Sequence, residues 1–463
     1  MINVLFIAIE FAPINTTGAF RSLAFSKYLR QYDINPVVVT LPEEQGVLAF
    51  GAKVDPHLQR EMPPNLDLVR VPCEDGTRYY RTRLRQFLTV YFSVEDSLGG
   101  RWRAQLDARL PDIVDRYHPD AVYVSMPPFS AGRVAVDVAN RYGLPLVVDM
   151  RDGWSQWRIG AFGSWLHYWL TVRRERRIFA RAERVFATTA QLADRFAQTH
   201  PRLPADKFHV ITNGFDFELT LPEVLTTAPV SNDRPFVIGY VGSFYYTPEA
   251  RASHFTPWWR KRLHRKLQYS PVKEDWLYRS PFFFFRALRR LLDRRPDLRG
   301  RVQFRVLGSN PPWLDEMAQA LGVRECCDFQ GRGGVADVLR FQSEVDALLC
   351  TAAKVPGGED WALASKTFDY LRAGKPLLGF TPRGAQRDFL ERSGFAVLVD
   401  PDDADAGPDA IERLVAGGHE FRPNHEFLQR YHRRVTTEQL ARELTSAAKN
   451  ARRDSFKTFA IAH

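Results

Sequence analysis

The sequence predicts an α/β protein built from two doubly wound domains, and three observations support that prediction. Short apolar runs alternate with helical patterns along the 463 residues, which is typical of parallel sheets covered by helices. The length exceeds the size of one compact core, which favours two domains. The alternation starts afresh after a polar, proline-bearing stretch at residues 218–235, where we place a linker.

The first half of the chain reads as a series of parallel strands and helices. The first two strands enclose a loop and a helix, and ligands of open α/β sheets bind at such loops. The loop lacks G-x-G-x-x-G, so the fingerprint of nicotinamide cofactors is absent. The predicted strands are Asn3–Ile9, Pro36–Thr40, Leu66–Val71, Ala121–Ser125, Pro145–Asp149 and Val185–Thr189.

The second half repeats this pattern. Residues 420–450 are predicted to be helical, and we expect the C-terminal helices to cross back to the first half. The predicted division is therefore a first domain at 1–217, a linker at 218–235, a second domain at 236–419 and the C-terminal helices at 420–463. The predicted strands are Phe236–Val241, Val302–Leu307, Asp328–Gly331, Val345–Cys350, Pro376–Phe380 and Ala396–Val399.

Composition indicates a soluble protein in a reducing compartment. Hydrophobic content of 45% and charged content of 25% are those of a globular chain. No run of 18 apolar residues occurs, and the N-terminus lacks the basic region of a signal peptide. The four cysteines and eleven histidines show no metal-ligand or disulfide spacing. We expect a cytoplasmic location, no metal site and no cofactor.

An insertion at about 247–283 is both basic and aromatic. The segment from Arg251 to Arg295 contains thirteen Arg or Lys residues and only three acidic residues. Aromatic rings and cations together suit a surface of anionic lipids, although nucleic acid or internal packing could use the same composition. We favour the membrane, peripherally on the inner face of the cell membrane, and place no nucleic acid among the partners. The predicted membrane contacts are Trp258, Trp259, Arg260, Lys261 and Arg262.

A second basic and aromatic stretch, Tyr79–Arg103, is predicted to be a helical excursion near the mouth of the cleft between the domains.

A short helix near residue 365 has an open N-terminus. Gly374 ends it as a C-cap and Pro376 prevents its continuation. The first amides of a helix lack internal partners and attract anions, so a phosphate would suit Ser365 and Lys366. An ordinary surface helix is the alternative.

Four motifs in order resemble one family. They are F-x-P-x-x-x-x-G-x-x-R from Phe11 to Arg21, ITNGFD, YVGS and SKTFDYLRAGKP. Their order resembles the GT-B glycosyltransferases, specifically retaining glycosyltransferase family four. The resemblance implies two Rossmann-like domains facing a cleft and retaining transfer of a sugar from a nucleoside-diphosphate donor without a bound metal.

The resemblance also implies donor-binding residues. Without a metal, the charge on the departing diphosphate must be met by helix N-termini and cations. Lys366 would then contact the β-phosphate, and Asp369 the donor ribose. The predicted donor-binding residues are Gly18, Arg21, Gly242, Ser243, Gly331, Asp360, Ser365 and Asp369, of which Gly331 would lie near the base.

The sequence departs from the family at one acidic position. Family members usually carry two glutamates with seven residues between them, and the resemblance assigns the second to Asp369 and the first to Trp361. Glu359 or Asp360 would have to supply the missing carboxylate.

The predicted catalytic residues are Asp149, Asp152, Glu359 and Lys366. Asp149 or Asp152 could orient or deprotonate the acceptor hydroxyl. The alternative for these two aspartates is an Asp–Arg ion pair that closes a loop.

We therefore predict a hexosyltransferase whose acceptor is a saccharide, expected to be lipid-linked and used in surface polysaccharide biosynthesis. Two alternatives remain at this point: a nucleotide-sugar epimerase of the same fold, and a non-catalytic scaffold at the membrane surface, which Trp361 makes conceivable.

Overall fold

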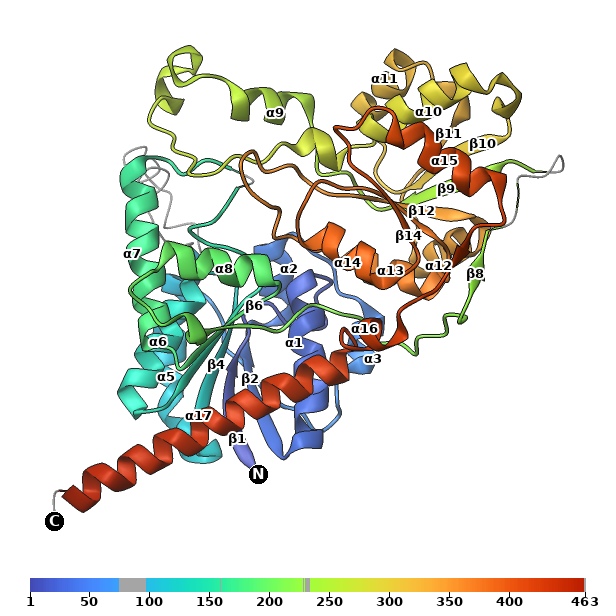
Figure 1. The fold of residues 1–463 in the computed structure, drawn as a ribbon. Coiled ribbons are helices and arrows are strands. Elements are labelled where there is room, and N and C mark those ends of the chain that lie inside the picture. Colours follow the sequence, from blue (N-terminus) through green and yellow to red (C-terminus); the bar gives the residue numbers. More distant parts are fainter. Residues whose placement is uncertain (75–96, 159, 228, 230–233, 462–463) are drawn as a thin grey trace. The chain divides into compact units, whose positions relative to one another are not determined.

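The computed structural model describes residues 1–74, 97–158, 160–227, 229 and 234–461, and the chain divides into two compact units (Figure 1). Each unit has its own parallel sheet, so the predicted α/β class is confirmed. Most of the predicted excursion at 79–103 lies outside the described residues. Unit 1 contains Met1–Asp216, Arg262–Pro271 and Tyr431–His463, and unit 2 contains Phe217–Lys261 and Val272–Arg430.

The sheet of unit 1 has seven parallel strands in the order β3-β2-β1-β4-β5-β6-β7. The chain winds outward from β1 in one direction and from β4 in the other, which creates a switch point between these two strands. The strands are β1 (Ile2–Ile7), β2 (Ile34–Thr40), β3 (Asp67–Arg70), β4 (Ala121–Met126), β5 (Leu146–Met150), β6 (Arg184–Ala187) and β7 (Phe208–Val210).

Helices cover the sheet of unit 1, including the helix at the end of the chain. Leu440 and Leu444 of that last helix enter the same buried cluster as Phe25 of the first. The helices are α1 (Thr17–Tyr28), α2 (Glu43–Phe50), α3 (Pro56–Glu61), α5 (Ser97–Tyr117), α6 (Ser130–Tyr142), α7 (Trp165–Arg181), α8 (Ala190–Thr199) and α17 (Arg433–Ile461).

The sheet of unit 2 has six parallel strands in the order β11-β10-β9-β12-β13-β14, the same winding as in unit 1. Its switch point lies between β9 and β12. The strands are β9 (Phe236–Val241), β10 (Val302–Leu307), β11 (Cys327–Gln330), β12 (Ala347–Thr351), β13 (Leu377–Phe380) and β14 (Ala396–Val399).

The helices of unit 2 follow these strands. One of them begins with four phenylalanines, Phe282–Phe285, and buries three of them in the core. The helices are α9 (Pro248–Phe255), α10 (Phe282–Arg294), α11 (Pro312–Ala320), α12 (Val335–Glu344), α13 (Ser365–Ala373), α14 (Ala385–Ser393), α15 (Ala406–Ala416) and α16 (His425–Gln429).

The structure differs from the predicted linker and from the predicted helix at 420. Leu225–Thr226 forms strand β8, which pairs antiparallel with β15 at Glu420–Phe421. This pairing joins segments that are distant in sequence, and neither segment has a strand signal of its own. Two residues of the predicted linker therefore form a β-strand. The helical stretch predicted from residue 420 begins instead at His425.

The insertion is shared between the two units. Its first and last parts belong to unit 2, whereas Arg262–Pro271 belongs to unit 1. Backbone bonds connect Tyr269 with Phe162 in both directions, at 2.8 and 3.0 Å. The sequence indicated that the whole insertion belongs to the second domain. The structure differs, because Arg262–Pro271 belongs to unit 1.

Candidate functional site

A glycine turn stands at the carboxyl edge of the unit 2 sheet, beside the switch point. Gly242 follows β9 with φ +102°, a conformation that favours glycine. Gly308 follows β10, and a Cβ there would lie 1.9 Å from the carbonyl oxygen of Gly242. The two turns therefore pack backbone against backbone, which leaves the edge open to a ligand.

Helix α13 is fixed against this turn by side chains of the core. The Tyr370 hydroxyl accepts a bond of 2.9 Å from the amide of Val241, at the end of β9. Gln386 of α14 accepts a bond of 3.0 Å from the amide of Ala364 and also bonds the Thr367 hydroxyl. The predicted helix and its C-cap are confirmed, with Gly374 at φ +59°.

Lys366 lies beside the glycine turn. Its ammonium donates to the Tyr240 hydroxyl at 2.5 Å and lies 4.1 Å from the centre of the Tyr240 ring. A Cβ on Gly242 would lie 3.5 Å from the same nitrogen. The structure thus brings together Lys366 and Gly242, both of which the sequence analysis assigned to the donor site.

Burial is the main cause that lowers the pKa of Lys366 to about 8; Arg279 acts in the same direction, whereas Cys350 and Asp369 oppose it. A cation removed from water beside a second cation is destabilised, and a bound anion would relieve both effects. The electrostatics of the site therefore favour the binding of an anion.

Arg279 is the site residue that sequence reasoning missed. It ends a short 3-10 helix of the insertion, Trp276–Arg279, and its guanidinium lies 2.8 Å from Glu274 and 3.6 Å from Asp360. Its only signal in the sequence was membership of a basic stretch, which we had assigned to the membrane as a whole.

Asp360 lies in the interior of unit 2, and its predicted contact with the donor is not supported. The residue is 2% exposed, and its carboxylate accepts from the amide of Ala362 at 2.9 Å besides pairing with Arg279. Its backbone bonds the segment around Gly384 in both directions. A shift of the loop would have to break these bonds before the Asp360 carboxylate could contact a donor. The structure instead gives Asp360 the role of an ion-pair partner that positions Arg279.

The remaining acidic candidates of unit 2 are at the surface. Glu359 is exposed in the loop before α13, and Asp369 is exposed one turn after Ser365. Trp361 is buried, which fits packing rather than contact with a sugar. Ser365 and Ser243 are exposed near the helix start and the glycine turn. Glu359 and Asp369 therefore stay predicted ligands.

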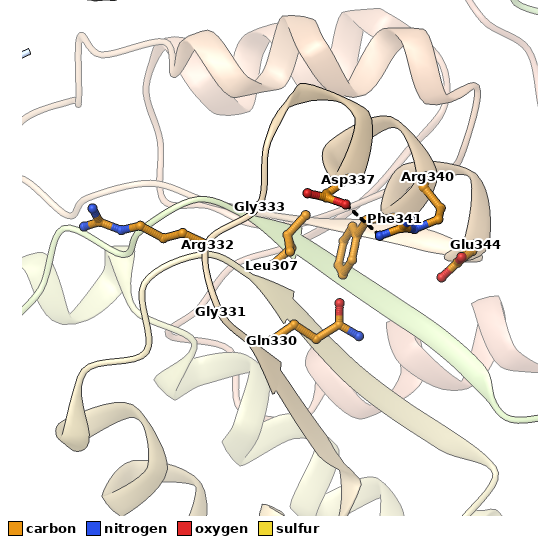
Figure 2. Close-up of a pocket in the computed structure, with 9 residues that line it drawn as sticks. All are labelled: Leu307, Gln330, Gly331, Arg332, Gly333, Asp337, Arg340, Phe341 and Glu344. Atoms are coloured by element: carbon orange, nitrogen blue, oxygen red, sulfur yellow. Dashed lines mark hydrogen bonds and ion pairs between the residues drawn. The ribbon is translucent and has the colours of Figure 1, made fainter. Parts of the chain in front are cut away.

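Gly331 lines a cavity of about 240 Å³ at the carboxyl end of β11 (Figure 2). Within it Asp337 accepts from Arg340 at 2.7 Å and from the amide of Gly334 at 2.9 Å. The cavity offers a polar rim and exposed backbone at Gly331, where a Cβ would meet nothing within 4 Å. The predicted role of Gly331 near a base stays a prediction.

Arg21 and Asp149 form a buried ion pair in unit 1, which corrects their predicted roles. Arg21 donates to both carboxylate oxygens of Asp149 at 2.9 and 2.8 Å. Its other donors reach Asn213 and the carbonyl oxygens of Ile211 and Thr212. Since all five N–H donors are used, none remains for a donor phosphate, and Asp149 at 0% exposure is closed to an acceptor.

Gly18 also has a packing role in place of the predicted approach to the donor. A Cβ at Gly18 would lie 1.8 Å from the guanidinium of Arg151 and 2.0 Å from the carboxylate of Glu10. These two groups form an ion pair, so the space above Gly18 is filled. Asp152, in the loop after β5, is partly exposed and stays a predicted catalytic residue.

The tip of the insertion is exposed. Trp258 and Trp259 are 63% and 61% exposed, and Arg260 and Arg262 beside them are exposed, with Lys261 partly so. Among the described residues, no helix combines the length and apolar character needed to cross a membrane. The same part of the chain holds no group of three or more His, Cys, Asp or Glu side chains suited to a metal ion.

The lowered pKa of Lys366 predicts how anion binding depends on pH. The ammonium loses its proton as pH rises through about 8, so a nucleoside diphosphate should bind about tenfold more weakly at pH 9 than at pH 7. Titration calorimetry with UDP and with GDP at the two pH values measures this. In Lys366→Ala the dependence should disappear; a dependence that persists there would assign it to another group.

Comparisons with known proteins agree with this architecture. Residues 22–214 match the family described as Glycosyl transferase 4-like domain. No curated protein matches the chain. Among solved structures, Anabaena Alr3699/HepE in complex with UDP is 14% identical at a TM-score of 0.55, over 96% of this chain and 100% of that one.

Two further structures are similar over nearly the whole chain. The apo form of the lipopolysaccharide outer core galactosyltransferase WaaB is 12% identical at a TM-score of 0.57, covering 96% of this chain and 99% of that one. An α,α-trehalose-phosphate synthase (UDP-forming) from Burkholderia vietnamiensis is 12% identical at 0.55, covering 97% and 100%. The chain thus has the GT-B fold, and the match to the glycosyl transferase 4-like domain is confined to residues 22–214.

Proposed function

We propose that the protein is a glycosyltransferase that transfers a sugar from a nucleoside-diphosphate donor to a saccharide acceptor. The observation that supports this most directly is the position of Lys366 at the glycine turn of unit 2, where Arg279 also acts on its charge. The glycosyltransferase 4-like domain of unit 1 and the UDP held by a structure of the same fold agree with it.

The chemistry of transfer explains why two cations and a helix start would be grouped here. As the bond between sugar and diphosphate breaks, negative charge grows on the departing phosphate oxygens. The ammonium of Lys366, the guanidinium of Arg279 and the first amides of α13 would stabilise that charge. Such an arrangement fits a leaving group stabilised without a bound metal.

The two cations differ in their hydrogen-bond and ion-pair partners, and we therefore assign them different roles. Arg279 is neutralised in part by Glu274 and Asp360 and is therefore a fixed donor of hydrogen bonds. Lys366 has no carboxylate within ion-pair distance in the described structure and bonds the neutral Tyr240. Burial raises the pKa of Tyr240, which keeps that hydroxyl protonated. The charge of Lys366 is therefore the one that a donor phosphate would neutralise.

The donor's other parts would meet the exposed acids. Asp369 would accept the ribose hydroxyls, Glu359 would contact the sugar, and the cavity at Gly331 would hold the base. In unit 1, Asp152 would orient the acceptor hydroxyl. We further propose retention of configuration and a hexose donor, as in the family that the sequence resembles.

The acceptor is proposed to be a lipid-linked saccharide used in surface polysaccharide. The exposed Trp258 and Trp259 with their neighbouring cations suit the headgroup layer of a membrane. The protein would then act in the cytoplasm, bound peripherally to the inner face of the cell membrane.

A donor screen tests the proposal. Calorimetry with UDP-, GDP- and ADP-hexoses should show binding of at least one nucleotide sugar, and a lipid-linked saccharide extract should then yield labelled glycolipid. The anomeric configuration of that product tests retention. Consumption of the donor with no acceptor present would indicate an epimerase, and absence of any nucleotide binding would indicate a scaffold.

A further inference from the structure

Three large apolar side chains stand exposed at the start of α7 in unit 1. Trp165 is 58% exposed, and Leu166 and Trp169 are each 40% exposed. The helix start is well formed, since the Ser164 hydroxyl accepts from the amide of His167 at 3.0 Å. Large apolar side chains gathered on an ordered helix mark a contact surface.

The exposed charge on α7 is entirely positive. The helix carries five arginines, and its single acid, Glu175, is fully buried against His200 and Ser155. Trp165, Trp169, Arg173 and Arg177 follow at intervals of four residues, so they lie along one side of the helix. The Arg173 guanidinium lies 5.1 Å from the centre of the Trp169 ring. Aromatic rings thus occupy one end of this stripe and cations the other.

Part of the insertion lies beside the same helix start. Tyr269 is bonded to the backbone of Phe162, and its ring lies 5.1 Å from that of Tyr168 on α7. The segment carries two strongly exposed leucines, Leu263 at 83% and Leu267 at 60%, and between them the exposed Arg265 and Lys266. Two segments about a hundred residues apart therefore present apolar and basic side chains on one unit.

A hollow lies next to the tryptophans. It has a volume of about 400 Å³ between α7 and α8, and it is lined by Trp165, Tyr168, Trp169, Val172, Arg195, Gln198 and Thr199. Arg195 donates to Gln198 at 3.0 Å, which leaves further guanidinium donors for an anion. The hollow combines aromatic walls with one cation, a composition that suits an amphiphilic molecule with a phosphate group.

We propose that unit 1 docks on an anionic lipid membrane through this surface, the α7 face, formed by Trp165, Leu166, Trp169, Arg173, Arg177, Leu263 and Leu267. The inference rests on the proposed membrane-bound acceptor and extends the contact from the insertion tip to the unit that would hold that acceptor. Tryptophan rings enter the boundary between headgroups and acyl chains, and the arginines contact lipid phosphates.

The charges favour a membrane over a second copy of the chain. Contact between two identical α7 faces would bring arginine stripes of like sign together, which is unfavourable. An anionic bilayer neutralises the same arginines and accepts the apolar side chains at once. Docking here would bring unit 1 to the surface in which a lipid-linked acceptor is embedded.

Flotation with vesicles tests the α7 face in the full-length protein. Wild type should float with phosphatidylcholine vesicles that contain 30% phosphatidylglycerol and should remain unbound with pure phosphatidylcholine. Arg173→Glu/Arg177→Glu should lower the partition coefficient by at least about 25-fold, because each lost arginine accounts for roughly fivefold and the new glutamates add repulsion from the anionic lipid. Trp165→Ser/Trp169→Ser should lower it by about tenfold and also remove the blue shift of tryptophan fluorescence that vesicles cause.

Matched variants outside the α7 face provide the controls. Leu48→Ser replaces an 83% exposed leucine on α2, and Arg116→Glu replaces an exposed arginine on α5; both should float like wild type. Unchanged flotation of both α7 double variants would overturn the proposal. So would a loss of self-association on sedimentation in the tryptophan variant together with no vesicle binding by wild type.

Nucleotide binding separates this inference from the proposed function. Both α7 variants should bind the nucleoside diphosphate with wild-type affinity, because the candidate donor site lies in unit 2. Vesicle binding that depends on α7 with no nucleotide binding by wild type would refute the glycosyltransferase proposal alone. Nucleotide binding with no vesicle binding would refute the α7 face alone.

Discussion

Lys366→Ala should weaken binding of the nucleoside diphosphate by about 1.5–3 kcal/mol, which corresponds to a factor of about 10 to 150. The ammonium bonds Tyr240, and no acid lies within ion-pair distance of it in the described structure, so its charge is available to a phosphate. Calorimetry with UDP and GDP measures the loss, and single-turnover transfer measures any further loss in the transition state.

Lys375→Ala is the matched control for this substitution. Lys375 lies two residues beyond the C-terminal end of the same helix, so the loss of its charge should leave affinity within about twofold of wild type. Equal effects of the two substitutions would show that only the overall charge matters. Unchanged affinity in Lys366→Ala would show that the start of α13 is not the diphosphate site.

Arg21→Ala should destabilise unit 1 by about 3–5 kcal/mol, the usual result of leaving one partner of a buried ion pair without the other. Asp149 would keep only the bond from Tyr123, at 2.8 Å, in a place fully closed to water. The carbonyl oxygens of Ile211 and Thr212 would lose their donor at the same time. Urea unfolding followed by circular dichroism measures the loss.

Lys27→Ala provides the comparison on the same helix. Lys27 pairs with Asp216 at 3.0 Å, but its side chain is 32% exposed, so its removal should cost no more than about 1 kcal/mol. In the folded fraction of Arg21→Ala, nucleotide affinity should equal that of wild type. A selective loss of nucleotide affinity without loss of stability would restore Arg21 to the donor site.

The strands could be predicted from the sequence because their signals are local to each strand. Apolar β-branched runs such as Val37–Val39 and Val147–Val148 are buried on both faces of a parallel sheet, so their composition alone predicts their position. Gly374 and Pro376 likewise end α13 by backbone geometry, which needs no tertiary partner. Both sheets and the helix of the candidate site follow from such signals.

The ion-pair partners of charged side chains could not be predicted from such local signals. Asp149 was predicted to be a catalytic group because it ends a strand, yet it pairs with Arg21, 128 residues away. Asp360 was predicted to contact the donor, yet it pairs with Arg279 from the insertion. A charged residue at a strand end has the same sequence signature whether it binds a ligand or closes the fold, and only burial and distance distinguish the two.

The sequence by itself therefore determined two parallel α/β sheets, the helix α13 with Lys366 at its start, and the position of Gly242 at the end of a strand. The tertiary structure alone decided that Arg279 joins them, that Arg21 and Asp149 are internal, and that the insertion contributes Arg262–Pro271 to unit 1. The physical reason is range. Strand and cap preferences act within a few residues, whereas ion pairs and surface patches form between segments that the fold alone brings together.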